Sequence, residues 1–158
     1  MSFGTGHHET TFLMINEMFC LNFKGKSVLD IGCGTGVLAI LSKMLGSEDT
    51  LGIDINEWSY ENSKENAVLN NIDSIEFLLG DISRINGDFD IVLANINRNV
   101  ILYDIDKYYK SMKENSDLIL SGFLSDDVTL IREKAESLGL SLVSQKNKDK
   151  WNLLHFIK

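Results

Sequence analysis

Short apolar runs that suit β-strands alternate with segments of helical periodicity, and this alternation restricts the fold more than any other feature of the sequence. Strands are predicted over residues 27–31, 50–55, 75–80, 89–96, 117–123, 140–147 and 151–158. Helices are predicted over residues 12–23, 37–45, 57–71, 100–115 and 125–139. Strands that alternate with helices form a parallel sheet covered on both faces. A charged turn at residues 148–150 joins the last two strands, so at least one of them is expected to run antiparallel.

The chain has 158 residues, which suffices for one domain and is too short for two ordinary ones. No apolar run approaches the roughly 20 residues of a membrane span, and the polar beginning does not resemble a signal peptide. Cys20 and Cys33 lack CxxC spacing and are predicted to be reduced thiols, with Cys20 facing the core. These features predict a cytoplasmic protein without a membrane partner.

The charge balance bears on the class of partner. The formal net charge is -8. Binding of nucleic acid without sequence preference requires clustered Lys and Arg side chains against phosphates, so we expect no direct nucleic-acid partner. A basic protein as substrate stays compatible with this charge.

A glycine-rich segment, Asp30-Ile31-Gly32-Cys33-Gly34-Thr35-Gly36, follows the first predicted strand. Ligands of open α/β sheets bind beyond the carboxyl ends of the strands, and glycines let a ligand approach the backbone closely. Asp54 follows Gly32 by 22 residues, where a carboxylate can accept hydrogen bonds from ribose hydroxyls. This pattern predicts a nucleoside-containing cofactor. A nicotinamide cofactor, disfavoured by Val37 at a position that wants Gly or Ala, and a loop that serves only the fold are the alternatives.

The GxGxG pattern, preceded by Asp30 and followed by GIDI, resembles class I S-adenosylmethionine-dependent methyltransferases. The resemblance implies a Rossmann-like, doubly wound α/β sheet of about seven strands, mostly parallel with an antiparallel C-terminal strand. It also implies S-adenosyl-L-methionine as cofactor, bound by Asp30, Gly32, Gly34 and Asp54. Asp81, after the third predicted strand, matches the position that often holds the adenine amino group; a solvated turn carboxylate is the alternative reading.

Asn95 ends the fourth predicted strand, which is otherwise apolar. Asn is disfavoured in strands, and a buried polar side chain without a partner costs about 1–3 kcal/mol. A role at the site, as a catalytic residue that also contacts the cofactor, explains Asn95 better than a capping role. Many amino-methyltransferases that act on adenine or glutamine carry Asn/Asp-Pro-Pro-aromatic here. The different sequence of residues 95–98, Asn-Ile-Asn-Arg, disfavours a planar amide or a base nitrogen as methyl acceptor.

The chain begins MSFGTGHHETT, and His7, His8 and Glu9 are residue types that bind metals. Adjacent histidines cannot easily point the same way, and no helical i, i+4 partner is present, so no metal site is expected. Acidic and hydroxyl side chains over residues 9–11 suit the first turn of a helix instead.

The same opening, together with GxGxG, GIDI and ANI, resembles the PrmA family, which methylates the eleventh protein of the large ribosomal subunit. That family carries FGTG-T-H-P-TT, and the matching positions here are Phe3, Gly4, Thr5, Gly6, His8, Thr10 and Thr11. His7 replaces Thr and Glu9 replaces Pro. The resemblance covers nearly the whole chain and implies a loop over the cofactor, with Thr11 in contact with S-adenosylmethionine.

The family resemblance further implies methyl transfer to amines of a ribosomal protein, either a lysine side chain or the N-terminal amine. Because the family has a substrate-recognition domain before this motif, we expect residues 1–158 to be a single catalytic domain from a longer protein. A small-molecule or RNA methyltransferase on the same fold, and a non-catalytic cofactor-binding module that regulates a partner, are the alternatives. The sequence does not indicate an oligomeric state.

Overall fold

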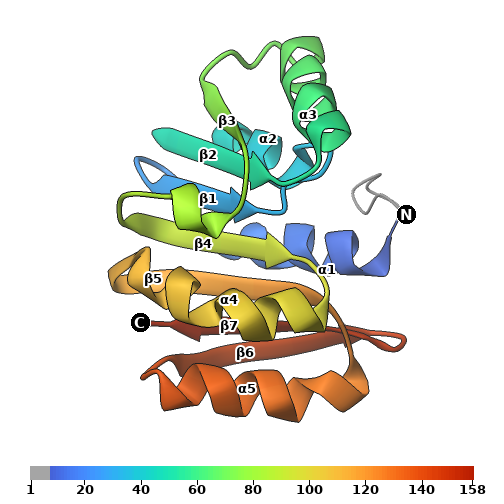
Figure 1. The fold of residues 1–158 in the computed structure, drawn as a ribbon, viewed down its shortest axis with the longest axis vertical. Coiled ribbons are helices and arrows are strands. Elements are labelled where there is room, and N and C mark those ends of the chain that lie inside the picture. Colours follow the sequence, from blue (N-terminus) through green and yellow to red (C-terminus); the bar gives the residue numbers. More distant parts are fainter. Residues whose placement is uncertain (1–7) are drawn as a thin grey trace.

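The computed structural model describes residues 8–158 and contains one seven-stranded sheet with helices on both faces (Figure 1). The strands are β1 (Ser27–Ile31), β2 (Asp49–Asp54), β3 (Ile75–Leu79), β4 (Phe89–Asn95), β5 (Met112–Leu124), β6 (Ser141–Lys148) and β7 (Trp151–Ile157). The helices are α1 (Glu9–Met18), α2 (Val37–Met44), α3 (Glu57–Leu69), α4 (Arg98–Lys110) and α5 (Val128–Ser137), with short 3₁₀ turns η1 (Ile82–Arg84) and η2 (Ser125–Asp127).

The sheet order is β3-β2-β1-β4-β5-β7-β6. The pairs from β3 through β5 are parallel, whereas β7 runs antiparallel to both β5 and β6. The predicted doubly wound sheet, mostly parallel with an antiparallel C-terminal strand, is therefore confirmed. The strand order reverses between β1 and β4, and open α/β sheets bind ligands at this switch point. No helix within residues 8–158 is long and apolar enough to cross a membrane.

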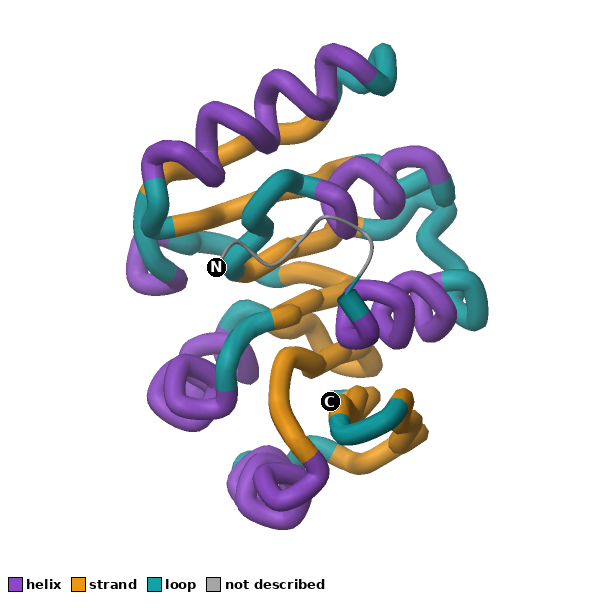
Figure 2. Tube along the Cα trace, turned by 90° about the vertical axis from the view of Figure 1, so that its right-hand side faces the viewer, coloured by secondary structure: helices purple, strands orange, loops and turns teal. Residues whose placement is uncertain are grey.

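Two apolar cores lie on opposite faces of the sheet, beneath the helices that cover both faces (Figure 2). Ile91 and Leu93 of β4 pack with residues of α1 and α2. Their neighbours Val92 and Ala94 pack with residues of α4 and α5 on the other face. All four side chains are at most 1% exposed. A central strand buried on both faces explains why the sequence of β4 is a continuous apolar run that ends only at Asn95.

Two predicted helices have different bounds in the structure. The helix predicted over residues 12–23 is α1 (Glu9–Met18), whose first turn holds Glu9, Thr10 and Thr11 as expected. The helix predicted over residues 100–115 is α4 (Arg98–Lys110), because the chain from Met112 onward already belongs to β5, where Met112 pairs with Phe89. The prediction that Cys20 faces the core is wrong: Cys20 lies beyond the end of α1 and is exposed, whereas Cys33 is buried.

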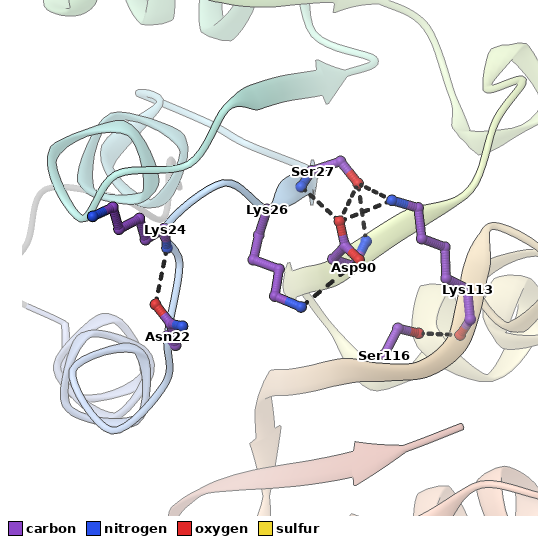
Figure 3. Close-up of polar contacts among 7 residues, drawn as sticks. All are labelled: Asn22, Lys24, Lys26, Ser27, Asp90, Lys113 and Ser116. Carbon is purple, nitrogen blue, oxygen red and sulfur yellow. Dashed lines mark hydrogen bonds and ion pairs between the residues drawn. The ribbon is translucent and has the colours of Figure 1, made fainter.

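The amino ends of β1, β4 and β5 are joined by a polar cluster centred on Asp90 (Figure 3). Its Oδ2 accepts hydrogen bonds from the backbone N–H and the hydroxyl of Ser27, both at 2.9 Å, and from Lys113 Nζ at 2.9 Å. Lys26 Nζ lies 4.0 Å from Oδ1. Partial burial alone would raise the pKa of Asp90, but hydrogen bonds from Lys113 and Ser27 lower it to about 2. This Asp90 cluster (Lys26, Ser27, Asp90 and Lys113) ties three strand ends together, at the opposite edge of the sheet from the switch point.

Candidate functional site

An open cleft of about 870 Å³ lies at the carboxyl ends of β1, β2 and β4. Its lining comes from the ends of these strands, the turn after β3, the first turn of α3 and the first two turns of α4. In Figure 1 the arrowheads of β1, β2 and β4 mark this edge of the sheet. The structure brings the predicted site residues Gly32, Gly34, Asp54, Asp81 and Asn95 together in the lining, and their contact with a cofactor stays a prediction.

The glycine loop between β1 and α2 lines the cleft through Gly32 and Gly34. Gly32, Gly34 and Gly36 have φ values of 64°, 56° and 81°, a region that side-chain-bearing residues rarely adopt. A Cβ atom on Gly32 would lie only 2.5 Å from Cγ2 of Ile96. The N–H of Cys33 donates to the carbonyl of Ile53 at 3.0 Å, which fixes the loop against β2. The glycines therefore permit both the backbone path and the close approach of the segment after β4.

Asp54 stands at the end of β2, directly beside the glycine loop. Its Oδ2 accepts the N–H of Gly34 at 2.9 Å, and its Oδ1 accepts the N–H of Asn56 at 2.9 Å. Each carboxylate oxygen can accept a further hydrogen bond, because each has two lone pairs. The side chain is thus held in place and retains acceptor capacity toward the cleft that it lines.

Asp30 lies behind the cleft and is not among the residues that line it. Its side chain is buried, and its Oδ2 accepts the N–H of Ala39 in the first turn of α2 at 3.1 Å. Burial raises the pKa of Asp30 to about 8, against the opposing effect of the Ala39 N–H, and the charge of Asp54 contributes to the rise. A direct contact of Asp30 with a ligand stays a prediction. The contact in the structure is with the start of α2.

Asp81 lines the cleft after β3, and its carboxylate also caps the short turn η1. Oδ1 accepts the N–H of Ser83 at 2.8 Å and the hydroxyl of the same residue. These hydrogen bonds from Ser83 lower the pKa of Asp81. This position is compatible with both interpretations of the sequence, a contact with the adenine amino group and a solvated turn carboxylate, because the carboxylate of the turn lies at the edge of the cleft.

Asn95 contacts Thr11, although 84 positions separate the two residues in the chain. Nδ2 of Asn95 donates to Oγ1 of Thr11, at 3.4 Å. Thr11 is fully buried in the first turn of α1 and lies outside the lining of the cleft. Oδ1 of Asn95 is buried and has no hydrogen-bond partner within residues 8–158. Asn97 caps α4 instead, accepting the N–H of Val100 at 3.2 Å, so the capping role considered for Asn95 belongs to its neighbour.

The described part of the N-terminal motif begins at His8, since residues 1–7, including His7, lie outside it. His8 is the N-cap of α1, and its Nδ1 accepts the N–H of Thr10 at 3.3 Å. The imidazole ring packs edge-on against Trp151, with 4.8 Å between ring centroids. Within residues 8–158, no group of three or more His, Cys, Asp or Glu side chains is arranged to hold a metal ion.

Exposed apolar side chains in the lining were not predicted from the sequence. Ile55, Trp58 and Tyr103 are 78%, 60% and 78% exposed and line the cleft together with Val100. Ile55 follows directly after Asp54, and Trp58 stands in the first turn of α3, where polar residues are the rule. The sequence did contain a signal for this apolar side of the cleft, because large apolar residues occur just after a strand end and at the start of a helix.

Comparison with known proteins identifies the family. The family model described as ribosomal protein L11 methyltransferase (PrmA) matches residues 1–158. This chain belongs to the PrmA family. Curated PrmA relatives include ribosomal protein L11 methyltransferases of Phocaeicola vulgatus, 48% identical over 99% of this chain, and of Bacteroides thetaiotaomicron, also 48% identical over 99%. The chain spans only 57% and 56% of the lengths of these two relatives.

A solved structure extends the comparison to three dimensions. The crystal structure of a ribosomal protein L11 methylase from Lactobacillus delbrueckii subsp. bulgaricus superposes with a TM-score of 0.93 at 27% sequence identity. The match covers 97% of this chain and 80% of that one. The class I methyltransferase fold expected from the glycine loop is therefore the fold of this PrmA chain.

Proposed function

We propose that this chain is the catalytic domain of an S-adenosylmethionine-dependent protein methyltransferase. The proposed acceptors are amines, a lysine side chain or the N-terminal amine, of the large-subunit ribosomal protein named in its relatives, and the proposed location is the bacterial cytoplasm. Family membership and a cleft at the switch point of the sheet support this proposal. The observation that carries it is the unpartnered Oδ1 of Asn95 in a cleft built on a glycine loop.

The residues of the cleft fit S-adenosylmethionine. The glycine loop leaves its backbone accessible, Asp54 retains acceptor capacity for ribose hydroxyls, and Asp81 stands at the far edge for the adenine. The apolar side chains of Ile55 and Trp58 supply a surface for the base. When bound, S-adenosylmethionine supplies a methyl group activated by a positively charged sulfur.

Asn95 is proposed to bind the acceptor amine. An amine is nucleophilic only when neutral, and removing a proton from a lysine with a pKa near 10.4 costs roughly 4.6 kcal/mol at pH 7. Desolvation in the cleft disfavours the charged form and reduces that cost. Oδ1 of Asn95 can accept an N–H of the amine and thereby orient its lone pair, while Nδ2 stays committed to Thr11. Positioning of this kind is a major source of rate enhancement.

Binding of S-adenosylhomocysteine, the demethylated product, tests the cofactor part of the proposal. At 100 times the dissociation constant, ligand linkage predicts a stabilisation of about 2.7 kcal/mol, measured as a rise in melting temperature. Asp54→Ala should abolish most of this rise, whereas Asp126→Ala, within η2 and outside the lining of the cleft, should leave it unchanged. A rise with NADH and none with S-adenosylhomocysteine would contradict the proposal.

Transfer of a radiolabelled methyl group to the purified ribosomal protein tests the reaction. We propose that the part of the relatives' length that this chain does not cover contributes substrate recognition. This chain alone should then bind the cofactor but methylate slowly, and joining it to the upstream region of the Phocaeicola vulgatus relative should restore the rate by raising the effective concentration of substrate. Equal rates for both proteins at low substrate would refute the separate recognition role. Cofactor binding without transfer by either protein would favour the non-catalytic alternative.

A further inference from the structure

Helix α1 connects the candidate site with a buried group of charges. Its first turn carries Thr11, the partner of Asn95. Its last turn carries Glu17, whose side chain is 5% exposed and contacts Ser144 and Lys146 of β6 and His155 of β7. We call this group the α1 anchor: Glu17 of α1, Asp117 of β5, Lys146 of β6 and His155 of β7. About 9 Å of helix separates Thr11 from Glu17, so a shift at one end reaches the other through a rigid element.

The imidazole of His155 bridges two carboxylates. Nδ1 lies 2.8 Å from Oε1 of Glu17, and Nε2 lies 2.8 Å from Oδ1 of Asp117. A neutral imidazole has only one N–H, so it can donate to only one of two ionised carboxylates. Both contacts are hydrogen bonds only when the ring is doubly protonated. Burial by itself lowers the pKa of His155, but the hydrogen bonds to Asp117 and Glu17 outweigh it, and the net pKa is raised.

The remaining contacts complete the anchor. Lys146 Nζ lies 2.5 Å from Oε2 of Glu17, and the hydroxyl of Ser144 donates to Oε1 at 2.8 Å. With His155 protonated, two positive groups balance two carboxylates. Although burial favours its neutral form, the hydrogen bonds from Lys146, Ser144 and His155 keep the pKa of Glu17 below its usual value. Removal of one partner from such a buried ionic group leaves an uncompensated charge and is strongly unfavourable.

We propose that the α1 anchor positions Thr11 against Asn95, which makes His155 and Glu17 positioning residues of the site. Because Nδ2 of Asn95 donates to Thr11, the orientation of the amide is set and Oδ1 is left as the free hydrogen-bond acceptor. If α1 moves away, the side-chain amide of Asn95 loses this constraint and can rotate. The consequence for the acceptor amine rests on the proposed function, whereas the coupling between the two ends of α1 does not.

The anchor also makes the site sensitive to pH. The charged and titratable groups that face His155 and Lys146 are Glu17 and Cys20 from α1 and Asp117 from β5, and Lys146 itself comes from β6. When His155 loses a proton, one ring nitrogen presents a lone pair to a carboxylate, and Lys146 alone opposes two negative charges. The last turn of α1 is then held less firmly, and Thr11 in the first turn of the same helix moves with it.

The first measurement needs no substitution. Nitrogen chemical shifts of the imidazole should show His155 protonated predominantly on both nitrogens at pH 6.5, with loss of a proton above that pH. The side-chain amide signals of Asn95 should change over the same pH range. A predominantly singly protonated His155 at pH 6.5, or Asn95 signals that do not change as His155 titrates, would overturn the proposal. This experiment uses the protein without any ligand.

The second measurement compares His155→Gln and Glu17→Gln with Asp90→Asn, which removes a charge from the Asp90 cluster at the other edge of the sheet. Thr11 and Asn95 are also predicted to contact the cofactor. Below the melting temperature of each variant, the two anchor variants should therefore bind S-adenosylhomocysteine roughly tenfold more weakly, and the control should stay within about twofold of wild type. Wild-type affinity should fall as His155 deprotonates, and His155→Gln should lack that dependence. If His155→Gln does not fold, Glu17→Gln and the wild-type pH profile carry the comparison.

The outcomes separate the two proposals. Absence of any S-adenosylhomocysteine binding by wild type refutes the proposed function, and the Asn95 signals of the ligand-free protein then decide the positioning role. Normal wild-type binding with equal affinities for the anchor variants and the control refutes the positioning role alone. Weaker binding by both anchor variants, with altered Asn95 signals and an unaffected control, supports it.

Discussion

Asp90→Asn should destabilise the protein by an amount that depends on pH. Asp90 has a folded-state pKa of about 2, against an ordinary value of 3.8. At 1.36 kcal/mol for each pH unit, this difference corresponds to roughly 2.4 kcal/mol of unfolding free energy. Because 21% of the side chain is exposed, solvent screens the interaction with Lys113, and we expect a loss of about 1–2 kcal/mol at neutral pH. The amide can still accept the N–H of Ser27, so the backbone contact survives.

The sign of the pH dependence follows from the lowered pKa. An acid that ionises more readily in the folded state stabilises that state above pH 3.8, and the contribution disappears as the pH falls through about 2. Urea unfolding of wild type and Asp90→Asn between pH 2 and 7 should therefore give curves that converge at the acidic end. In a Lys113→Met background the Asp90→Asn loss should be smaller, because the principal cation is already gone. A constant difference between the curves across this range would refute the electrostatic explanation.

Three further predictions test other parts of the structure. Asp30 has a folded-state pKa of about 8, above its ordinary 3.8, so its contribution to the stability of the fold is lost as the pH rises from about 4 to 8. Asp30→Asn should remove this decline in the free energy of unfolding, measured with urea, and its amide oxygen can still accept the N–H of Ala39. Gly122→Ala should lower both the melting temperature and the affinity for S-adenosylhomocysteine, because Gly122 has a φ of 96° and a Cβ there would lie 2.3 Å from the carbonyl oxygen of Ile96. Tyr108→Phe should be neutral or stabilising by about 1 kcal/mol in thermal unfolding, because the buried hydroxyl has no partner among the described residues.

The parts of the fold that could be predicted are those specified locally. The strand, glycine loop and helix around Gly32 are read from adjacent residues, and the position of Asp54 follows from its distance along the chain. The long strand β5 could not be read in this way. Its first residues look helical in sequence, yet Met112 pairs with Phe89, and Asn115 adopts a φ of 59° that carries the chain onward. Pairing with a neighbouring strand, which the local sequence does not encode, decides the conformation there.

The same distinction applies to the candidate site. Asn95 was identified because a polar residue ends an apolar strand, but its contact with Thr11 rests on tertiary packing of α1. The α1 anchor had no sequence signal at all. Glu17, Asp117 and His155 come from three elements, and the two hydrogen bonds of the imidazole span 138 and 38 positions of the chain. An isolated buried histidine in a strand is indistinguishable, in sequence, from one that only fills space.

The segment after β4 shows how packing from several directions fixes one side chain. Cγ2 of Ile96 occupies the space left by Gly32, the backbone of Ile96 approaches Gly122, and its N–H donates to the carbonyl of Ser121 at 3.0 Å. Gly32 of the glycine loop and Gly122 of β5 therefore leave room for the same residue from opposite sides. This contact fixes the backbone next to Asn95 but leaves the torsion of its amide free. The contact with Thr11 supplies the missing constraint, so the orientation of Asn95 depends on where α1 is held. For this reason, substitutions at the far end of α1 are expected to act on the amide orientation, whereas substitutions at Gly122 are expected to act on the backbone itself.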